Sequence, residues 1–215
     1  MNKNEQFVIS INRELGSGGR TIGSMLAEKL GVHFYDKAVI KALEEKYQLT
    51  VEEIEKLKGR KHNWWADFER IANIGQGMTS AYSSSFTSNG TNQPTTYEMF
   101  KVETEILQDI VDEESCVVAG RSGFFVFRNH PNHLSVLLQA SLPHRVARVA
   151  RKQNITEEEA RKIIEKVDRM RENYVKKFTN TSRYDARSYD MVITMDKITD
   201  EDAVALILDY IDRQS

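Results

Sequence analysis

The stretch that decides the fold is FVISINRELGSGGRT, residues 7–21. Residues 7–11 are apolar and rich in β-branched side chains, which predicts a short buried strand. The glycine cluster that follows predicts a tight turn. Beyond Thr21 the apolar residues fall at helical spacing, and Gly31 supplies a stop signal. The opening unit is therefore a strand, a glycine turn and a helix.

The same alternation of strands and helices continues along the chain. Further short apolar strands are predicted at 32–35, 116–119, 134–138 and 190–195. Helices are predicted at 39–47, from Thr50, at 97–114, at 142–178 with a break at 154–156, and at 202–211. Parallel strands need crossover helices that cover both faces of the sheet. The pattern therefore predicts an α/β fold, a five-stranded parallel sheet flanked by helices, with ligands bound beyond the carboxyl ends of the strands.

Length, charge and cysteine content narrow the class of protein. The 215 residues suit one domain that carries an inserted subdomain. A net charge of -2 gives no support for a general nucleic-acid surface. The single cysteine, Cys116, argues against a disulfide scaffold or a cysteine zinc site. No apolar stretch reaches the roughly 20 residues of a membrane span, so we expect a cytoplasmic protein without a membrane partner.

The glycine turn is similar to the phosphate-binding pattern G-x-x-x-x-G-K-[ST], in which backbone N–H groups wrap a phosphate at the start of a helix. Placing the second glycine of the pattern on Gly19 puts Arg20 at the lysine position and Thr21 at the hydroxyl position. Glu14 then stands where the first glycine belongs. The glycine turn lies between a predicted strand and a predicted helix, and it carries a cation and a hydroxyl at the positions that the pattern requires. These features favour a phosphate-binding site over a turn that only reverses the chain.

Two further groups of arginines are candidates for binding phosphate. Arg121 directly follows a predicted strand, at the sheet edge where a guanidinium can hold a phosphate through two hydrogen bonds. A structural role for Arg121, as a cap of the next turn, explains its position equally well. Arg145 and Arg148 share a helix face, as do Asp168 and Arg171. A solvated charged helix explains these pairs without function, whereas phosphoryl transfer requires convergent cations.

Residues 58–96 differ in composition from the rest of the chain and suggest an inserted segment. The segment begins with basic residues around Lys58 and the pair Trp64-Trp65, and it continues with a run rich in Ser, Thr, Asn and Gly. Nucleic-acid binding through this basic and aromatic start would be sensitive to salt. Aromatic residues at near-helical spacing are more often local core, so no nucleic-acid partner is expected.

Five blocks of the sequence resemble the cytidylate kinase-like branch of the P-loop nucleoside monophosphate kinases. They are residues 9–20, FYDK at 34–37, VAGR at 118–121, Asp168-x-x-Arg171 and YDMVI at 189–193. The blocks occur in family order over nearly the whole chain. The resemblance implies a single P-loop kinase domain over 1–215, an acceptor-binding insert at 58–96 and an arginine-bearing lid at 142–180.

The resemblance also implies roles for individual residues. The loop that binds the phosphates of ATP would consist of Gly16, Ser17, Gly18, Gly19, Arg20 and Thr21, with Thr21 as an indirect ligand of Mg²⁺. Arg20, Arg145, Arg148 and Arg171 would act on the transferring phosphoryl group. The acceptor nucleotide would be bound by Asp36, Arg121, Asp168 and Arg171.

The sequence departs from this family pattern at two places that matter. Ser122 follows Gly120-Arg121 where cytidylate kinases carry an aspartate, and Arg20 replaces the lysine of the phosphate loop. The leading hypothesis is transfer of a phosphoryl group from ATP, with Mg²⁺, to a nucleoside monophosphate, CMP or dCMP first. The alternatives are a kinase for another small acceptor and a catalytically inactive, nucleotide-binding regulatory protein.

Overall fold

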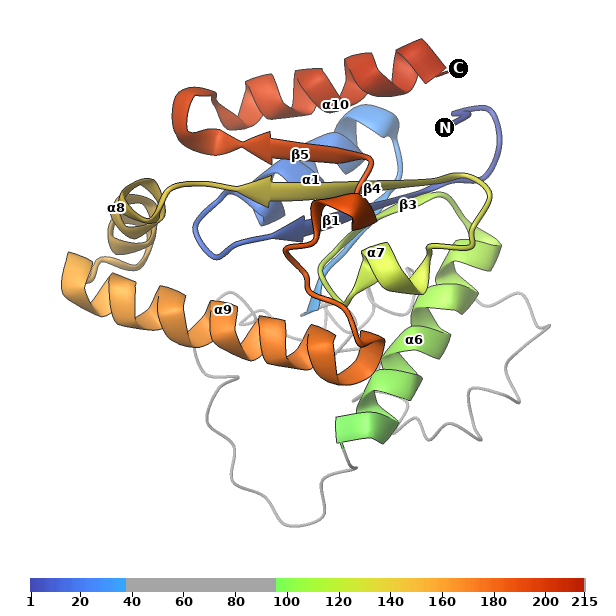
Figure 1. Cartoon of the computed structure of the whole chain (residues 1–215). Helices are drawn as coiled ribbons and strands as arrows, with labels where there is room; N and C mark the ends of the chain where they lie inside the picture. The colour runs from blue at the N-terminus through green and yellow to red at the C-terminus, as the bar shows by residue number, and fades with distance from the viewer. Residues whose placement is uncertain (38–95, 215) are drawn as a thin grey trace, which may run out of the picture. The chain divides into compact units, whose positions relative to one another are not determined.

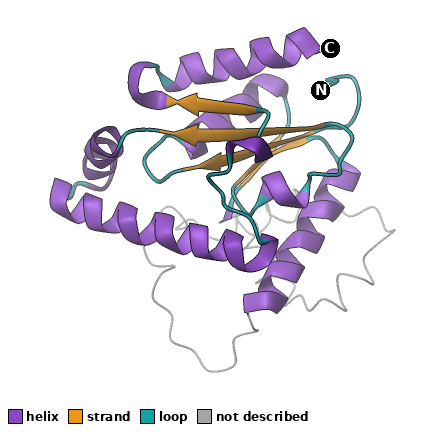
Figure 2. Ribbon diagram, in the orientation of Figure 1, coloured by secondary structure: helices purple, strands orange, loops and turns teal. Residues whose placement is uncertain are grey.

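The computed structural model describes residues 1–37 and 96–214. Its centre is a five-stranded parallel sheet of order β2-β3-β1-β4-β5 (Figures 1 and 2), which confirms the predicted α/β fold. The strands are β1 (Val8–Arg13), β2 (His33–Tyr35), β3 (Cys116–Ala119), β4 (His133–Gln139) and β5 (Met191–Thr194). Ile11 of β1 lies opposite Ala119 of β3 and Val136 of β4. The strand that leads into the glycine turn is thus the middle strand.

Helices follow the strands in the predicted order. They are α1 (Gly19–Leu30), α6 (Thr96–Glu113), α7 (Gly123–Val126), α8 (Leu142–Gln153), α9 (Glu157–Thr179) and α10 (Asp200–Gln214), with short 3-10 turns η1 (Ala186–Ser188) and η2 (Met195–Lys197). The helices predicted at 39–47 and from Thr50, and nearly all of the 58–96 insert, lie outside the described residues. No helix among the described residues has the length and apolarity needed to cross a membrane.

The chain divides into two compact units. The first contains Met1–Phe34 and Ser115–Ser215, and the second contains Tyr35–Glu114. In the first unit, the main core lies between the sheet and the helices α1 and α10. Its buried apolar residues include Ile9, Ile11, Ile22, Leu26, Val136, Leu138, Val204, Ile207 and Ile211.

Local signals explain where the helices begin and end. Gly18 precedes α1 with φ of 92°, and Gly31 ends it with φ of 66°. Both angles are left-handed, which costs a residue with a side chain about 1–2 kcal/mol, so glycine suits both positions. A capping box of Thr156 and Glu159 is present at the start of α9, directly after the break predicted at 154–156. The break between α8 and α9 is therefore encoded locally.

Leu15, within the glycine turn, joins a second and smaller apolar cluster. The cluster consists of buried residues of α8 and α9, namely Val146, Val149, Ala160 and Ile164. In Figure 1, α8 lies at the end of the sheet to which the arrows of β4 and β5 point. Packing of Leu15 against this cluster therefore brings the turn after β1 alongside α8 and α9.

His133, at the start of β4, should make the folded protein sensitive to mild acid. Its Nε2 atom lies 2.8 Å from Oγ of Ser10 on β1, and burial lowers the pKa of the imidazole from 6.5 to about 4. The unfolded chain takes up this proton near pH 6.5, so stability is full above that pH and falls as the pH is lowered. Between pH 6.5 and about pH 5 we expect a loss of about 2 kcal/mol in the free energy of unfolding.

Urea unfolding at a series of pH values measures this loss. The variant His133→Gln keeps a polar side chain but cannot be protonated, so its stability should change much less over the same range. A variant that loses stability as steeply as the wild type would show that another group causes the acid sensitivity.

Candidate active site

The turn between β1 and α1 has a backbone shape that requires glycine. Gly16 and Gly18 have φ of 90° and 92°. A Cβ atom at Gly16 would lie 2.8 Å from the carbonyl oxygen of Arg145, and one at Gly18 would lie 2.7 Å from Oδ1 of Asp200. The first N–H groups of a helix have no carbonyl partner within it, so the start of α1 offers donors for an anion. The turn therefore combines close packing with the donors that a phosphate needs.

Glu14 connects this turn to the end of β4. Its N–H donates to the carbonyl of Leu138 at 3.1 Å, and its Oε2 atom accepts the N–H of Ala140 at 3.0 Å. The same Oε2 lies 3.5 Å from Nε of Arg145. Ser17 Oγ can donate to the carbonyls of Glu14 and Leu138, each at 3.0 Å. The residue that departs from the glycine pattern thus stabilises the turn.

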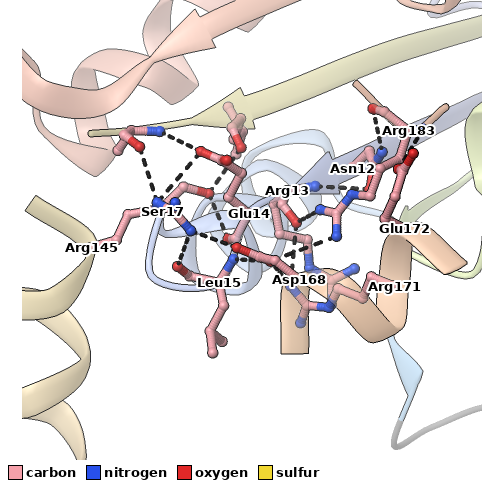
Figure 3. Close-up of polar contacts among 12 residues, drawn as sticks. Asn12, Arg13, Glu14, Leu15, Ser17, Arg145, Asp168, Arg171, Glu172 and Arg183 are labelled. Carbon is pink, nitrogen blue, oxygen red and sulfur yellow. Dashed lines mark hydrogen bonds and ion pairs between the residues drawn. The ribbon is translucent and has the colours of Figure 1, made fainter. Parts of the chain in front are cut away.

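Asp168 of α9 contacts both the turn and three arginines, as Figure 3 shows. Its Oδ1 accepts the N–H of Leu15 at 3.0 Å, and its Oδ2 accepts from Nη1 of Arg145 at 2.5 Å. Nη1 atoms of Arg171 and Arg183 lie 3.7 and 3.6 Å from Oδ1. The structure thus brings together Asp168, Arg145 and Arg171 around the turn. Contact of this group with an acceptor nucleotide remains a prediction.

Arg183 was not predicted as a site residue, and its side chain is fully buried. Its Nη2 donates to the carbonyl of Arg13, and Nη1 of Arg171 donates to the same oxygen at 3.3 Å. The backbone carbonyl of Arg183 accepts from the hydroxyl of Tyr189 at 2.7 Å and from the amide of Asn12 at 3.4 Å. Burial raises the pKa of Tyr189 from 10 to about 12, so its donating hydroxyl stays protonated even in alkaline solution. Arg183 lies between α9 and η1, where no periodicity marks a buried side chain.

Arg148 and Thr21 each contact a residue that was not among the predicted site residues. Arg148 binds Asp200, the first residue of α10, through two hydrogen bonds of 2.9 and 2.6 Å. Oγ1 of Thr21 accepts from Nζ of Lys152 at 3.3 Å. Lys152 is seven residues beyond Arg145, a spacing that could have revealed its place on the same face of α8. Arg20 is exposed in the first turn of α1.

Two residues predicted to bind the acceptor nucleotide lie outside the group around Asp168. They are Arg121, after β3, and Asp36, after β2. Arg121 follows β3 with φ of 52° and donates from Nη2 to the hydroxyl of Tyr174 at 3.4 Å. Its guanidinium also lies 5.6 Å from the centre of the Tyr174 ring. Asp36 directly follows β2 and is buried, but it belongs to the second unit. Arg121 therefore contacts α9 through Tyr174.

The glycine turn follows the middle strand of a five-stranded parallel sheet and opens the first helix. This arrangement defines the kinase-like P-loop fold. The fold supports nucleotide-dependent phosphoryl transfer in general. Residues 8–197 match the model of the cytidylate kinase-like family, and the chain belongs to that family. No curated protein matches the sequence significantly.

Solved structures share the fold at low sequence identity. An uncharacterized protein from Eubacterium ventriosum has a TM-score of 0.66 at 22% identity, over 96% of this chain and 99% of that one. Shikimate kinase from Bacteroides thetaiotaomicron has a TM-score of 0.51 at 14% identity, over 96% of this chain and 98% of that one. Both likenesses concern the fold.

Proposed function

We propose that this protein transfers the γ-phosphoryl group of ATP to a nucleoside monophosphate, with CMP or dCMP as the first candidates. The observation that carries the proposal is the glycine turn at the start of α1, surrounded by the arginines of α8 and α9. Membership of the cytidylate kinase-like family supports the choice of acceptor. The phosphate loop would be Gly16–Thr21.

The proposed reaction needs no dedicated general base. An oxygen of the acceptor's phosphate attacks the γ-phosphorus, the bond from that phosphorus to the bridging oxygen breaks, and ADP leaves with the electron pair. Charge spreads over the oxygens of the moving group, so catalysis depends on cations placed around it. Arg20 is proposed to contact the phosphates of ATP, and Arg145 and Arg148 to neutralise the moving group. Arg121, Arg171, Asp168 and Asp36 are proposed to hold the acceptor.

The arrangement near Thr21 is compatible with a magnesium–nucleotide complex. Among the described residues, no group of three or more His, Cys, Asp or Glu side chains is arranged to hold a metal. Mg²⁺ in kinase sites typically takes few protein ligands and binds mainly waters and substrate phosphates. We propose that Thr21 contributes indirectly. Mg²⁺ would supply positive charge to the β- and γ-phosphates.

In the Arg145–Asp168 and Arg148–Asp200 pairs, each arginine is already compensated by a carboxylate. For these arginines to contact a phosphoryl group, they must exchange or share those partners when the nucleotide binds. Residues 142–180 are therefore proposed to act as a lid that closes over the substrates and excludes water.

The deciding experiment follows ADP formation from ATP and Mg²⁺ with CMP, dCMP, UMP, AMP, GMP or shikimate as acceptor. A control without acceptor measures hydrolysis of ATP alone. Formation of ADP that depends on one monophosphate, with the matching diphosphate as product, would support the proposal and name the base.

Two other outcomes have defined meanings. Turnover with shikimate alone would favour a kinase for another small acceptor. Binding of ATP without turnover on any acceptor would favour an inactive, nucleotide-binding regulatory protein. Either outcome would contradict the monophosphate kinase proposal.

A further inference from the structure

A row of three cations runs along the face of α8 that meets the turn between β1 and α1. Arg145, Arg148 and Lys152 occupy positions i, i+3 and i+7, which lie on one stripe of a helix. Each cation meets a successive part of the turn. Nη1 of Arg145 donates to the carbonyl of Leu15 at 3.4 Å, and Nζ of Lys152 donates to Oγ1 of Thr21 at 3.3 Å.

Arg148 occupies the middle of this row. Its two terminal nitrogens lie 3.1 Å from the position that a Cβ atom on Gly18 would take. The stripe on α8 is therefore in register with the turn from Leu15 to Thr21. A chain of phosphates lying on the turn would meet the three cations in order.

The three cations differ in how their charge is compensated. Arg145 is paired with Asp168, and Arg148 binds Asp200 through two hydrogen bonds. For Lys152, no Asp or Glu in the described parts of the chain lies within ion-pair distance of its ammonium group. Lys152 thus brings to the hydroxyl of Thr21 a positive charge that no carboxylate of these parts neutralises.

The position of this ammonium group, beside the N-terminal end of α1, indicates what kind of ligand its charge would attract. Thr21 lies in the first turn of α1, and the N-terminal end of a helix carries a partial positive charge of its own. A lysine beside this end is electrostatically unfavourable in isolation. An anion between the ammonium group and the helix end would be attracted by both.

We propose that Lys152 binds the polyphosphate of the nucleotide and supplies the ammonium group that the turn itself lacks. The inference rests on the proposed function, because it assigns a residue to the same nucleotide site. P-loops place a lysine as a point charge on the phosphates, and the planar guanidinium of Arg20 does not reproduce that geometry. The flexible stem of Lys152 allows its ammonium to move from Thr21 to a phosphate oxygen, which leaves the hydroxyl available.

The test compares Lys152→Ala with Lys29→Ala. Both residues are exposed lysines in the last turn of a helix, Lys152 in α8 and Lys29 in α1, so both substitutions remove a favourable charge from a C-terminal helix end. Isothermal titration calorimetry with ATP and with ADP measures affinity independently of turnover. Lys152→Ala should weaken ATP binding about 10- to 100-fold, the range for loss of a charge-assisted hydrogen bond. Lys29→Ala should stay within about twofold of the wild type.

A second variant tests the assigned role more sharply. Adding Arg20→Lys to Lys152→Ala places a lysine back at the loop position, and it should restore most of the lost ATP affinity. Thermal unfolding of all variants checks that the fold is retained. A purely structural role for Lys152 would lower the unfolding temperature and would not be rescued by Arg20→Lys.

The outcomes separate this inference from the proposed function. If the wild type binds neither ATP nor ADP, the proposed function fails. If the wild type binds ATP and Lys152→Ala binds it equally well, the inference about Lys152 is wrong and the proposed function stands. The same holds if Arg20→Lys alone keeps wild-type ATP affinity but restores nothing in the double variant.

Discussion

Replacing Arg20 with alanine is expected to lower kcat/KM for phosphoryl transfer by about 100- to 1,000-fold. Arg20 stands at the lysine position of the phosphate loop, in the first turn of α1, and we propose that it contacts the phosphates of ATP. Removal of one cation from a site that stabilises developing charge typically has an effect of this size. Because the side chain is exposed, the thermal unfolding temperature should change little.

Steady-state kinetics with the acceptor found in the panel assay measures the effect. Arg213→Ala, which removes an exposed arginine from the last turn of α10, serves as the matched control and should retain wild-type kinetics. An Arg20→Ala enzyme that keeps more than about a third of wild-type kcat/KM would contradict the assigned role of Arg20, because even one weak charge contact is worth that much.

The conservative change Arg20→Lys distinguishes a working phosphate loop from a degenerate one. A lysine at this position restores the family pattern, so activity should be kept or should increase. Loss of activity in Arg20→Lys would mean that the guanidinium itself is required, as it would be for two parallel hydrogen bonds to one phosphate.

Replacing Asp168 with asparagine is expected to lower the free energy of unfolding by about 3–5 kcal/mol. Asp168 is buried, and its carboxylate faces the guanidinium groups of Arg145, Arg171 and Arg183. Asparagine can still accept the N–H of Leu15, but it removes the carboxylate charge that faces all three cations, and Glu14 then compensates only Arg145. Breaking a buried pair on one side leaves uncompensated charge, which is costly.

Urea unfolding with circular dichroism measures this loss. Asp212→Asn is the control, since Asp212 pairs with Lys3 on the surface and its removal should cost less than about 1 kcal/mol. Equal stabilities of the two variants would show that carbonyl groups such as that of Arg13 suffice to hold the arginines. The role of Asp168 would then be confined to the substrate.

Local signals explain why so much of the sheet could be predicted. Strands such as β1 and β3 are buried on both faces, so their sequences are nearly continuous apolar runs bounded by turn residues. Gly31 and the Thr156–Glu159 box mark helix ends through backbone chemistry that involves only neighbouring residues. Within the described residues, the predicted strand and helix boundaries therefore agree with the structure to within a few residues.

The candidate site was predictable only in part. The glycine turn and the cations at 20, 145, 148 and 171 carry recognisable spacing, so they could be named. Glu14 was visible only as a departure from a pattern, yet it holds the turn to β4 through Ala140. Arg183 had no signal at all, because its burial depends on the path of an irregular segment.

The sequence by itself determined the order of strands and helices, the glycine turn at the end of the first strand and the family to which the chain belongs. These features depend on residues that are close together along the chain. Only the tertiary structure decided that Asp168 pairs with Arg145, that Asp200 pairs with Arg148, and that Lys152 meets Thr21 with no carboxylate partner among residues 1–37 and 96–214. The attraction between two charges depends on their distance in space and not on their separation along the chain. With 30 basic and 32 acidic residues, many ion pairs are possible, and packing selects which of them form.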